Sequence, residues 1–169
     1  MESLFITRDD ITRLTAMGGS VDVDKYIQFI KIAQDLHIKK YLGQNLFEKL
    51  QLLISAGTIN LPINVNYKDL LEIYVKYMTI HFSMVEYLPF ASYTIGNKGV
   101  YKHTSENGVV VDKSEIDMLI EKERQIAQSY TQRFIDHIQN YSSLYPEYNT
   151  NSNGDMYPTT KNNFNGWHL

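Results

Sequence analysis

The chain has 169 residues, of which 43% are hydrophobic and 21% charged, values that are ordinary for a single globular domain. It contains no cysteine, which excludes disulfide bonds, thiolate nucleophiles and cysteine-ligated zinc. The net charge of −3 argues against a dedicated nucleic-acid-binding protein. No apolar run approaches the roughly 20 residues of a membrane span, and no basic-then-apolar signal region begins the sequence, so we expect an intracellular protein that contacts no membrane.

Two helices are expected at the beginning of the chain. The first begins at Thr7, which has the capping-box spacing with Asp10, and it ends before Gly18. The second begins after Asp22 or Asp24, either of which can cap it. Its apolar residues recur at helical spacing through the stretch YIQFIKIAQDLHI.

A third helix is expected after Gly43, which interrupts the pattern and allows the chain to turn at little steric cost. This helix runs from about Gln44 to Ala56 with one apolar stripe, and Gly57 is placed to end it.

The fourth expected helix, from about Tyr67 to Leu88, is apolar around most of its circumference and is stopped by Pro89. A helix of this kind is surrounded by neighbours, so we expect it to be the central and most buried helix. Its polar positions form one narrow stripe: Asp69, Glu72, Lys76, Thr79, Ser83 and Glu86.

Residues 92–113 have the alternating, Val-, Thr- and Tyr-rich character of strands. Asn107 and Gly108 form a hairpin turn signal, which predicts strands at about Gly99–Thr104 and Val109–Val111. An isolated hairpin is only marginally stable, so we expect this one to lean on the body or on a neighbouring subunit. Asn107 and Gly108 are therefore predicted partner-binding residues.

The last helix is expected to open with Ser114 and Asp117 in capping-box spacing and to run to about Tyr141. The predicted fold is mainly α: a compact bundle of about five helices with one β-hairpin insertion and a long irregular C-terminal arm. We expect residues 1–144 to form the helical domain and residues 145–169 to form the extended arm.

The predicted arm combines turn-forming residues with aromatic ones. It contains six asparagines, two prolines and two glycines, which prevent regular structure, yet it carries the single tryptophan of the chain. A solvated tail is usually charged and poor in aromatics, so this composition favours docking on a partner surface, with a frayed terminus as the alternative. The predicted partner-binding residues are Tyr148, Tyr157, Phe164 and Trp167.

The sequence predicts no catalytic residue, no metal ligand and no cofactor. His37 and His81 lie at largely apolar helix positions, where a histidine is more often a hydrogen-bonded core residue than a ligand. No pair has the helical zinc-site spacing, and Asp136 and His137 are adjacent, so they point about 100° apart on a helix. Phosphate-binding loops and nucleophile elbows are also absent from the sequence.

The stretch from Asp24 to Leu53 resembles the core motif of the head–tail connector proteins of tailed bacteriophages, the helical adaptor family. The matching features are an acidic helix start, an Ile-x-x-Ala-Gln segment at Ile30–Gln34, and a Leu-Gly step at Leu42–Gly43 into a second amphipathic helix. The order of the predicted helices over residues 5–141 also agrees.

The resemblance implies a structural virion protein rather than an enzyme. Such adaptors form a homo-oligomeric ring, typically of twelve copies, between the capsid portal and the next neck or tail protein. The ring extends the channel through which DNA passes without sequence-specific contact. The implied location is the neck of the virion, with assembly in the cytoplasm of the bacterial host.

Three alternatives remain open at this stage. The chain could form another neck or tail-completion ring. It could be a small helical enzyme or binding module with an unrecognised site, which a deep pocket lined by His81 and Glu86 would favour. A DNA-binding regulator would need basic residues gathered on one exposed helix, and Lys31, Lys39 and Lys40 are too few.

Overall fold

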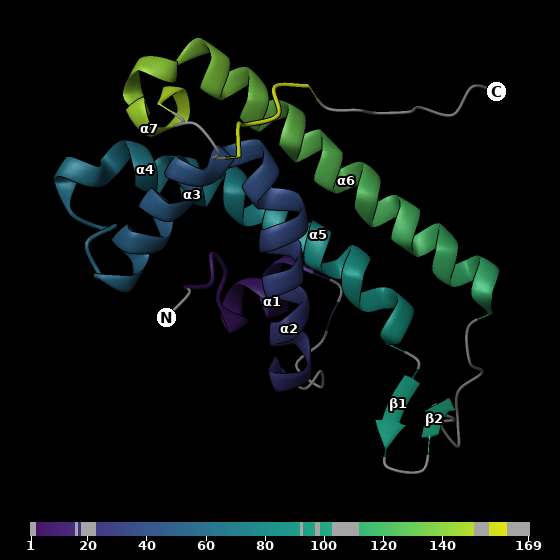
Figure 1. Ribbon diagram of the computed structural model, residues 1–169. Coiled ribbons are helices and arrows are strands. Elements are labelled where there is room, and N and C mark those ends of the chain that lie inside the picture. Colours follow the sequence, from purple (N-terminus) through teal and green to yellow (C-terminus); the bar gives the residue numbers. More distant parts are fainter. Residues whose placement is uncertain are drawn as a thin grey trace.

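The computed structural model is mainly α-helical, as the sequence predicts, and its longest helix lies along one side of the molecule (Figure 1). No helix in the ranges that it describes is both long and apolar enough to cross a bilayer. It describes residues 3–15, 17, 23–91, 93–96, 99–102, 112–150 and 156–161.

Helix α1 (Arg8–Leu14) has the predicted capping box. The Thr7 hydroxyl accepts a hydrogen bond from the Asp10 N–H (3.3 Å), and the Asp10 carboxylate accepts one from the Thr7 N–H (2.8 Å). The same carboxylate lies 3.1 Å from the Lys76 ammonium, which ties this short helix to the central one.

The second and third predicted helices meet at the predicted break, but the second is longer than expected. Helix α2 (Val23–Ala33) continues through a π-helical turn (η1, Gln34–Ile38) into α3 (Lys39–Ser55). Within α3, Gly43 has φ 73° and ψ 165°, so the helical axis is interrupted there. Gly57 has φ 67° just after the end of α3, which confirms its expected role.

The predicted central helix consists of α4 (Val65–Leu70), a π-helical turn (η3, Leu71–Val75) and α5 (Lys76–Tyr87). It begins two residues before the predicted start and gives way to a 3-10 turn (η4, Leu88–Phe90) at the predicted proline. Helix α5 lies between α2 and α6 and contacts both, which confirms its central position (Figure 1).

The polar stripe of this helix is partly internal. Thr79 and Ser83 are fully buried, and the Thr79 hydroxyl donates a hydrogen bond to the carbonyl of Val75 (2.7 Å). The hydroxyls of Ser83 and Tyr26 lie 2.6 Å apart, so a buried polar contact joins α5 to α2. The hydroxyls are small enough to be satisfied locally inside the core, which is why the stripe need not face water.

The described strands differ from the predicted hairpin. Strand β1 (Tyr93–Gly96) pairs antiparallel with β2 (Gly99–Lys102), so β2 pairs with the segment before it, and residues 109–111 lie outside the described residues. Residues 93–96 were not expected to be a strand, although Tyr, Thr and Ile favour one and two glycines flank the two-residue connection. The predicted turn at Asn107–Gly108 lies outside the described residues.

Helix α6 (Lys113–Asn140) begins one residue before the predicted cap, Ser114. Its N-cap is Asp112, not Ser114: the Asp112 carboxylate accepts from the Glu115 N–H (3.0 Å), and the Glu115 carboxylate accepts from the Asp112 N–H (3.0 Å). The Ser114 hydroxyl donates to the Asp112 carboxylate (2.7 Å). A 3-10 turn (η5, Ser142–Leu144) and the short helix α7 (Pro146–Asn149) follow.

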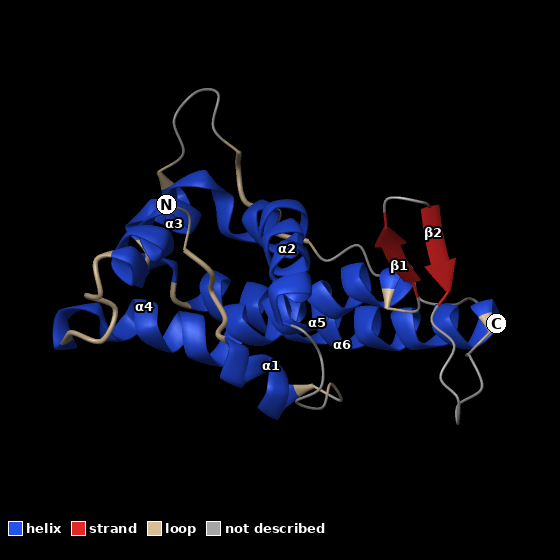
Figure 2. Cartoon of the chain, turned by 90° about the horizontal axis from the view of Figure 1, so that it is seen from below, coloured by secondary structure: helices blue, strands red, loops and turns tan. Residues whose placement is uncertain are grey.

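Apolar side chains are buried in two clusters. The smaller cluster joins α1, α2 and α5: Ile6, Ile11, Met17, Tyr26, Phe29, Ile30, Ile80 and Met84. The larger cluster joins α3, the central helix, the second half of α6 and α7; its fully buried members include Leu42, Leu46, Leu50, Leu70, Met78, Phe134, Ile138 and Tyr145. In both views β1 and β2 lie beside the beginning of α6, at the opposite end of the molecule from α4 (Figures 1 and 2).

Candidate interaction site at the helix break

The break in α3 is filled by a segment from the C-terminal part of the chain, residues 156–161, which we call the strap. In an uninterrupted helix the Gln44 N–H would bond to the carbonyl of Lys40, four residues earlier. Here the Gln44 N–H donates to the carbonyl of Met156 (3.0 Å), and the Lys40 carbonyl accepts from the Thr159 N–H (2.7 Å). The strap therefore satisfies one donor and one acceptor that lack their intrahelical partners at the break.

Gly43 allows the strap to approach the helix backbone. A Cβ atom at this position would lie 2.9 Å from Cδ of Pro158 and 3.2 Å from the carbonyl oxygen of Met156, closer than van der Waals contact. Pro158 has no N–H, and it sits between the two hydrogen-bonding residues of the strap. We call the Lys40 carbonyl, the Gln44 N–H and the Cα of Gly43 the seat.

The strap also reaches the far side of the bundle. The side-chain amide of Gln139, near the end of α6, donates to the carbonyl of Thr160 (3.4 Å). The strap thus connects α3 with α6 across the end of the molecule where α7 lies (Figure 1).

Residues 145–150 belong to the helical body rather than to an arm. Tyr145 and Tyr148 are 1% and 7% exposed within the larger core cluster. The Asn45 side chain donates to the carbonyl of Thr150. The structural boundary therefore falls after Thr150, because the two tyrosines fill the core at the end of α6, and not at the predicted position between residues 144 and 145.

The predicted partner-binding residues divide accordingly. Tyr148 is buried by its own subunit, so in this conformation it presents no surface to a partner. Tyr157 lies in the strap with 62% of its surface exposed. Phe164, Trp167, Asn107 and Gly108 lie outside the described residues.

Half of the exposed large apolar side chains among the described residues lie at two opposite ends of the molecule. At the loop end, which precedes and begins α4, they are Leu52, Leu61, Ile63 and Val65. At the strand end, around β1 and the beginning of α6, they are Phe90, Tyr93, Met118 and Leu119. Ile63 is 85% exposed, which is unusual for a large aliphatic residue.

Sequence reasoning did not single out the loop end, although a signal was present. Residues 52–67 contain no charged side chain and include Leu61, Pro62 and Ile63 in a turn. An uncharged apolar stretch that must turn at a surface cannot bury all of its side chains, which is a sign of an exposed apolar patch.

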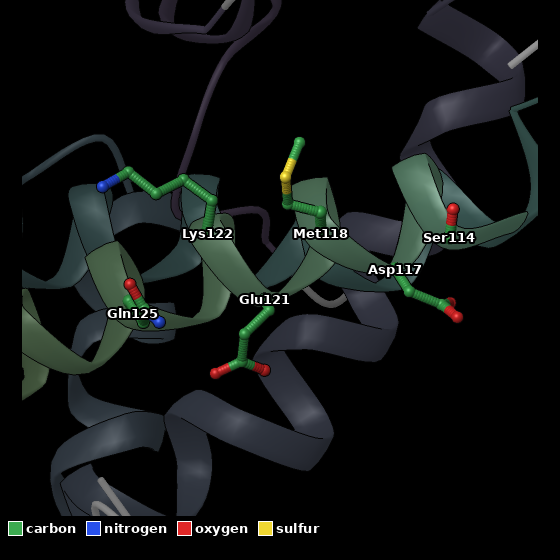
Figure 3. A pocket seen from close by; sticks show the side chains of 6 residues that line it. All are labelled: Ser114, Asp117, Met118, Glu121, Lys122 and Gln125. Atoms are coloured by element: carbon green, nitrogen blue, oxygen red, sulfur yellow. The ribbon is translucent and has the colours of Figure 1, made fainter. Parts of the chain in front are cut away.

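A hollow of about 460 Å³ lies on the outer side of the first half of α6 (Figure 3). Figure 3 shows Met118 and Lys122 extending to one side of the helix and Glu121 to the other, so these side chains do not converge on one point. The described residues that line the hollow are Ser114, Asp117, Met118, Glu121, Lys122 and Gln125.

Histidines join neighbouring helices in pairs. Nε2 of His37 lies 2.8 Å from a Glu86 carboxylate oxygen, and the ring stacks on Phe82 with centroids 4.4 Å apart. Nδ1 of His81 lies 2.7 Å from the Glu123 carboxylate. His81 and Glu86 thus belong to two different pairs and do not line one pocket together.

The surroundings of His37 and His137 fit structural roles. Burial lowers the pKa of His37 against the opposing effect of Glu86, and burial also lowers the pKa of His137. Nε2 of His137 lies 3.0 Å from the hydroxyl of Tyr145, away from the neighbouring Asp136, which accepts a bond from Gln132 instead. Within the described ranges, no three His, Asp or Glu residues are grouped so that they could hold a metal ion.

Comparison with known proteins gives one match. A model described as a family of unknown function (DUF6712) matches residues 38–158, which contain the seat and the first half of the strap. No curated protein and no solved structure matches the chain. Since the match spans more than two thirds of the sequence, the chain belongs to the DUF6712 family.

Proposed function

We propose that this chain is a structural virion protein that forms a ring between the capsid portal and the tail of a tailed bacteriophage. In this role it extends the DNA channel and presents a docking surface to the next neck or tail protein. The family match names no activity, so the proposal is drawn from the connector resemblance and from the surfaces of the subunit.

The observation that carries the proposal is the form of residues 24–53. They form two helices that meet at the Leu42–Gly43 step, as in the connector motif that the sequence resembles. Ala33 and Leu42 are completely buried on either side of η1, so the motif is a packing unit of the core. An ordinary helix–helix corner has the same features, and the subunit surfaces provide the functional part of the argument.

The two apolar ends fit a ring. In a cyclic assembly each subunit uses one surface toward the preceding copy and a different surface toward the next. The loop end and the strand end are separate apolar surfaces at opposite ends of one subunit (Figure 1). We assign the contact between copies to these two ends, with Ile63 of one copy packing against Met118 of the next.

The C-terminal arm and the predicted hairpin supply the outward contacts in this proposal. Beyond the strap, residues 162–169 carry Phe164 and Trp167, and aromatic residues contribute most energy per residue at interfaces. We assign these two residues to the portal or a neighbouring subunit. The predicted turn at Asn107–Gly108 is assigned to a neighbour in the ring, and the net charge of −3 suits a channel along which DNA slides without adhering.

Negative-stain imaging of the purified protein, with and without the portal protein of the same virus, tests the assembly. We expect closed rings that stack on the portal. Monodisperse single subunits in both samples, at every concentration, would overturn the proposal.

Charge substitutions test the two ends separately. Ile63→Asp and Met118→Asp should each abolish rings, while Leu36→Asp, at a residue 60% exposed outside both ends, should leave them intact. A mixture of the first two variants retains one intact contact and should form dimers that cannot close. The proposed contact between the loop end of one copy and the strand end of the next would be excluded if Ile63→Asp still formed rings. It would also be excluded if each variant alone formed as many dimers as the mixture.

The outward role of the arm has its own test. A chain that ends at Lys161 lacks Phe164 and Trp167 but keeps the strap. This chain should fold and form rings but fail to join portal-containing capsids. Normal incorporation into capsids would remove the arm from the proposal.

A further inference from the structure

We propose that the seat in α3 is an exchange site, which in the assembled protein holds the strap of a second copy of this chain. The occupant is therefore the segment Met156–Thr159 of a neighbour, in the same register as it takes within one subunit. The inference requires self-association but neither the portal nor DNA, so it goes beyond the connector role.

The first argument is the chemistry of recognition. Both hydrogen bonds between strap and seat join main-chain groups, and the third contact is that of Pro158 with the Cα of Gly43. These contacts are the same whichever copy supplies the strap. Addition of an extended segment to exposed main-chain groups is a common way in which proteins bind peptides.

The second argument is how lightly the strap is held. Met156 and Tyr157 are 44% and 62% exposed, and within the strap only Pro158 is partly covered. A segment that lies at the surface with most of its residues exposed opens far more readily than the core. Release from the seat therefore leaves the helical body folded.

The third argument is the connection between body and strap. The carbonyl of Thr150 accepts from Asn45, and that of Met156 accepts from Gln44, so the chain leaves the body and returns to it at adjacent residues. Residues 151–155, Asn-Ser-Asn-Gly-Asp, form this connection. Fully extended, it would span about 20 Å, enough to carry the strap away from its own seat.

Exchange would link the copies through the same contacts that the strap makes within one subunit. Swapping an identical element between protomers replaces each contact with an equivalent one, so its cost is low. Because the strap ends beside Gln139 of α6, the exchange would also carry Phe164 and Trp167 onto the copy that provides the seat. The seat would thus determine which neighbour the arm reaches.

Cysteine cross-linking tests the exchange, because the natural chain has no cysteine. Two full-length variants, Gln139→Cys and Thr160→Cys, place one thiol each on the two sides of the contact between α6 and the strap. They are mixed in equal amounts, with a mass tag on one, and treated with a short bis-maleimide. We expect a 139–160 cross-link between tagged and untagged chains whose yield rises with concentration.

Proline substitutions connect the cross-link to the seat. In the Thr160→Cys chain, Thr159→Pro removes the N–H that bonds to Lys40, and the cross-link should fall at least fivefold. Lys161→Pro introduces the same residue outside the seat and should leave the yield within twofold. Equal yields from the two proline variants would overturn the assignment to the seat.

The double variant Gln139→Cys/Thr160→Cys detects a strap that stays on its own subunit. If the strap never leaves its own subunit, this chain cross-links only within itself, and the mixture of single variants gives no product at any concentration. That result would overturn the exchange. Rings observed under the same conditions would leave the connector role intact, so the two proposals fail separately.

Discussion

The two halves of α6 have opposite environments although they form one continuous helix. In the second half, five residues are at most 1% exposed: Ala127, Thr131, Phe134, Ile135 and Ile138. In the first half, Lys113–Ile126, no residue is buried, and Met118 and Leu119 are 67% and 47% exposed. The second half contributes to the core of the subunit, whereas the first half exposes Met118 and Leu119 among charged side chains.

This contrast explains why the helix can be both structural and available for binding. Burial of apolar surface provides the main driving force for folding, so the second half is fixed by the core. A helix of 28 residues is well beyond the average length, and its first half, although Glu123 contacts His81 of α5, contributes no fully buried side chain to the core. Apolar residues on this first half are free to serve contacts between subunits.

Truncation of one side chain in each half should produce the largest difference. Phe134→Ala leaves a cavity in the larger core cluster and should lower the free energy of unfolding by about 3–5 kcal/mol. Met118→Ala, at an exposed site, should change it by less than about 0.5 kcal/mol. Urea denaturation of the single subunit measures both.

Similar losses for Phe134→Ala and Met118→Ala would contradict the division of the helix. In that case the first half would be packed as firmly as the second. The measurement should be made at low protein concentration, because association through the strand end would add stability to the Met118 side chain.

The next effect concerns the strap that rests on the second half of α6. Gly43→Ala introduces a left-handed residue and a clash with Pro158, whereas Gly57→Ala introduces only the left-handed residue, since its Cβ would meet open space. Gly57→Ala should cost about 1–2 kcal/mol. Gly43→Ala should cost at least as much and should release the strap, which protease cleavage near Tyr157 would detect.

The two glycines serve as controls for each other. Gly43→Ala and Gly57→Ala could lower the urea midpoint of unfolding equally, with no increase in cleavage near Tyr157. In that case the position of the strap would not depend on the close approach of Pro158 to Gly43. A chain that ends at Thr150 lacks the strap, so its unfolding gives the stability of the helical body alone.

A smaller effect is expected at the cap of the first half. Asp112→Ala removes the carboxylate that accepts from the Glu115 N–H, a loss of about 1 kcal/mol at a helix N-terminus. Because the first half is not buried, this loss should remain local. Hydrogen exchange of the first turns should accelerate about fivefold, while the global unfolding midpoint barely moves.

The matched variant is Thr7→Ala, which removes the N-cap hydroxyl that accepts from the Asp10 N–H at the start of α1. Helix α1 contributes Ile11 to the core, so this loss should appear in the global midpoint. A global shift for Asp112→Ala as large as that for Thr7→Ala would show that the first half of α6 unfolds with the core.

The helices could be predicted because they follow local rules. The capping box at Thr7, the break at Gly43 and the apolar stretch that ends at Pro89 are all written in neighbouring residues, and all three were confirmed. The boundaries were less accurate. Asp112 and Ser114 both begin capping-box patterns, and sequence alone does not show which one the chain uses.

Features that depend on distant residues could not be predicted. The seat is made by residues 40–44 and filled by residues 156–159, more than 110 positions later. The burial of Tyr145 and Tyr148 depends on the space left at the end of α6, so composition assigned them to the arm. Likewise, β2 has a possible partner on either side in sequence, and the Asn-Gly signal favoured the segment that follows it.

The smallest expected effect is a pH dependence of the second half of α6. Burial lowers the pKa of His137 below the ordinary value of 6.5, so in the folded subunit the ring stays neutral longer than in the unfolded chain. Its neighbours fit the neutral form: Tyr145 donates to the carbonyl of Asn66 (3.3 Å) and lies 3.0 Å from Nε2, while burial raises the pKa of Tyr145 to about 12.

As the pH falls through 6.5, His137 therefore takes up a proton in the unfolded chain but not in the folded one, and the free energy of unfolding decreases. Above pH 6.5 the contribution of the neutral ring to stability is fully present. His137→Gln cannot titrate and should show a shallower loss between pH 7 and pH 5 than the natural chain. His37, whose pKa burial also lowers, remains in this variant, so part of the slope should persist and disappear only with His37→Gln. Unfolding midpoints measured across that range decide the point: a slope unchanged by His137→Gln would mean that this end of α6 opens enough to protonate the ring without unfolding.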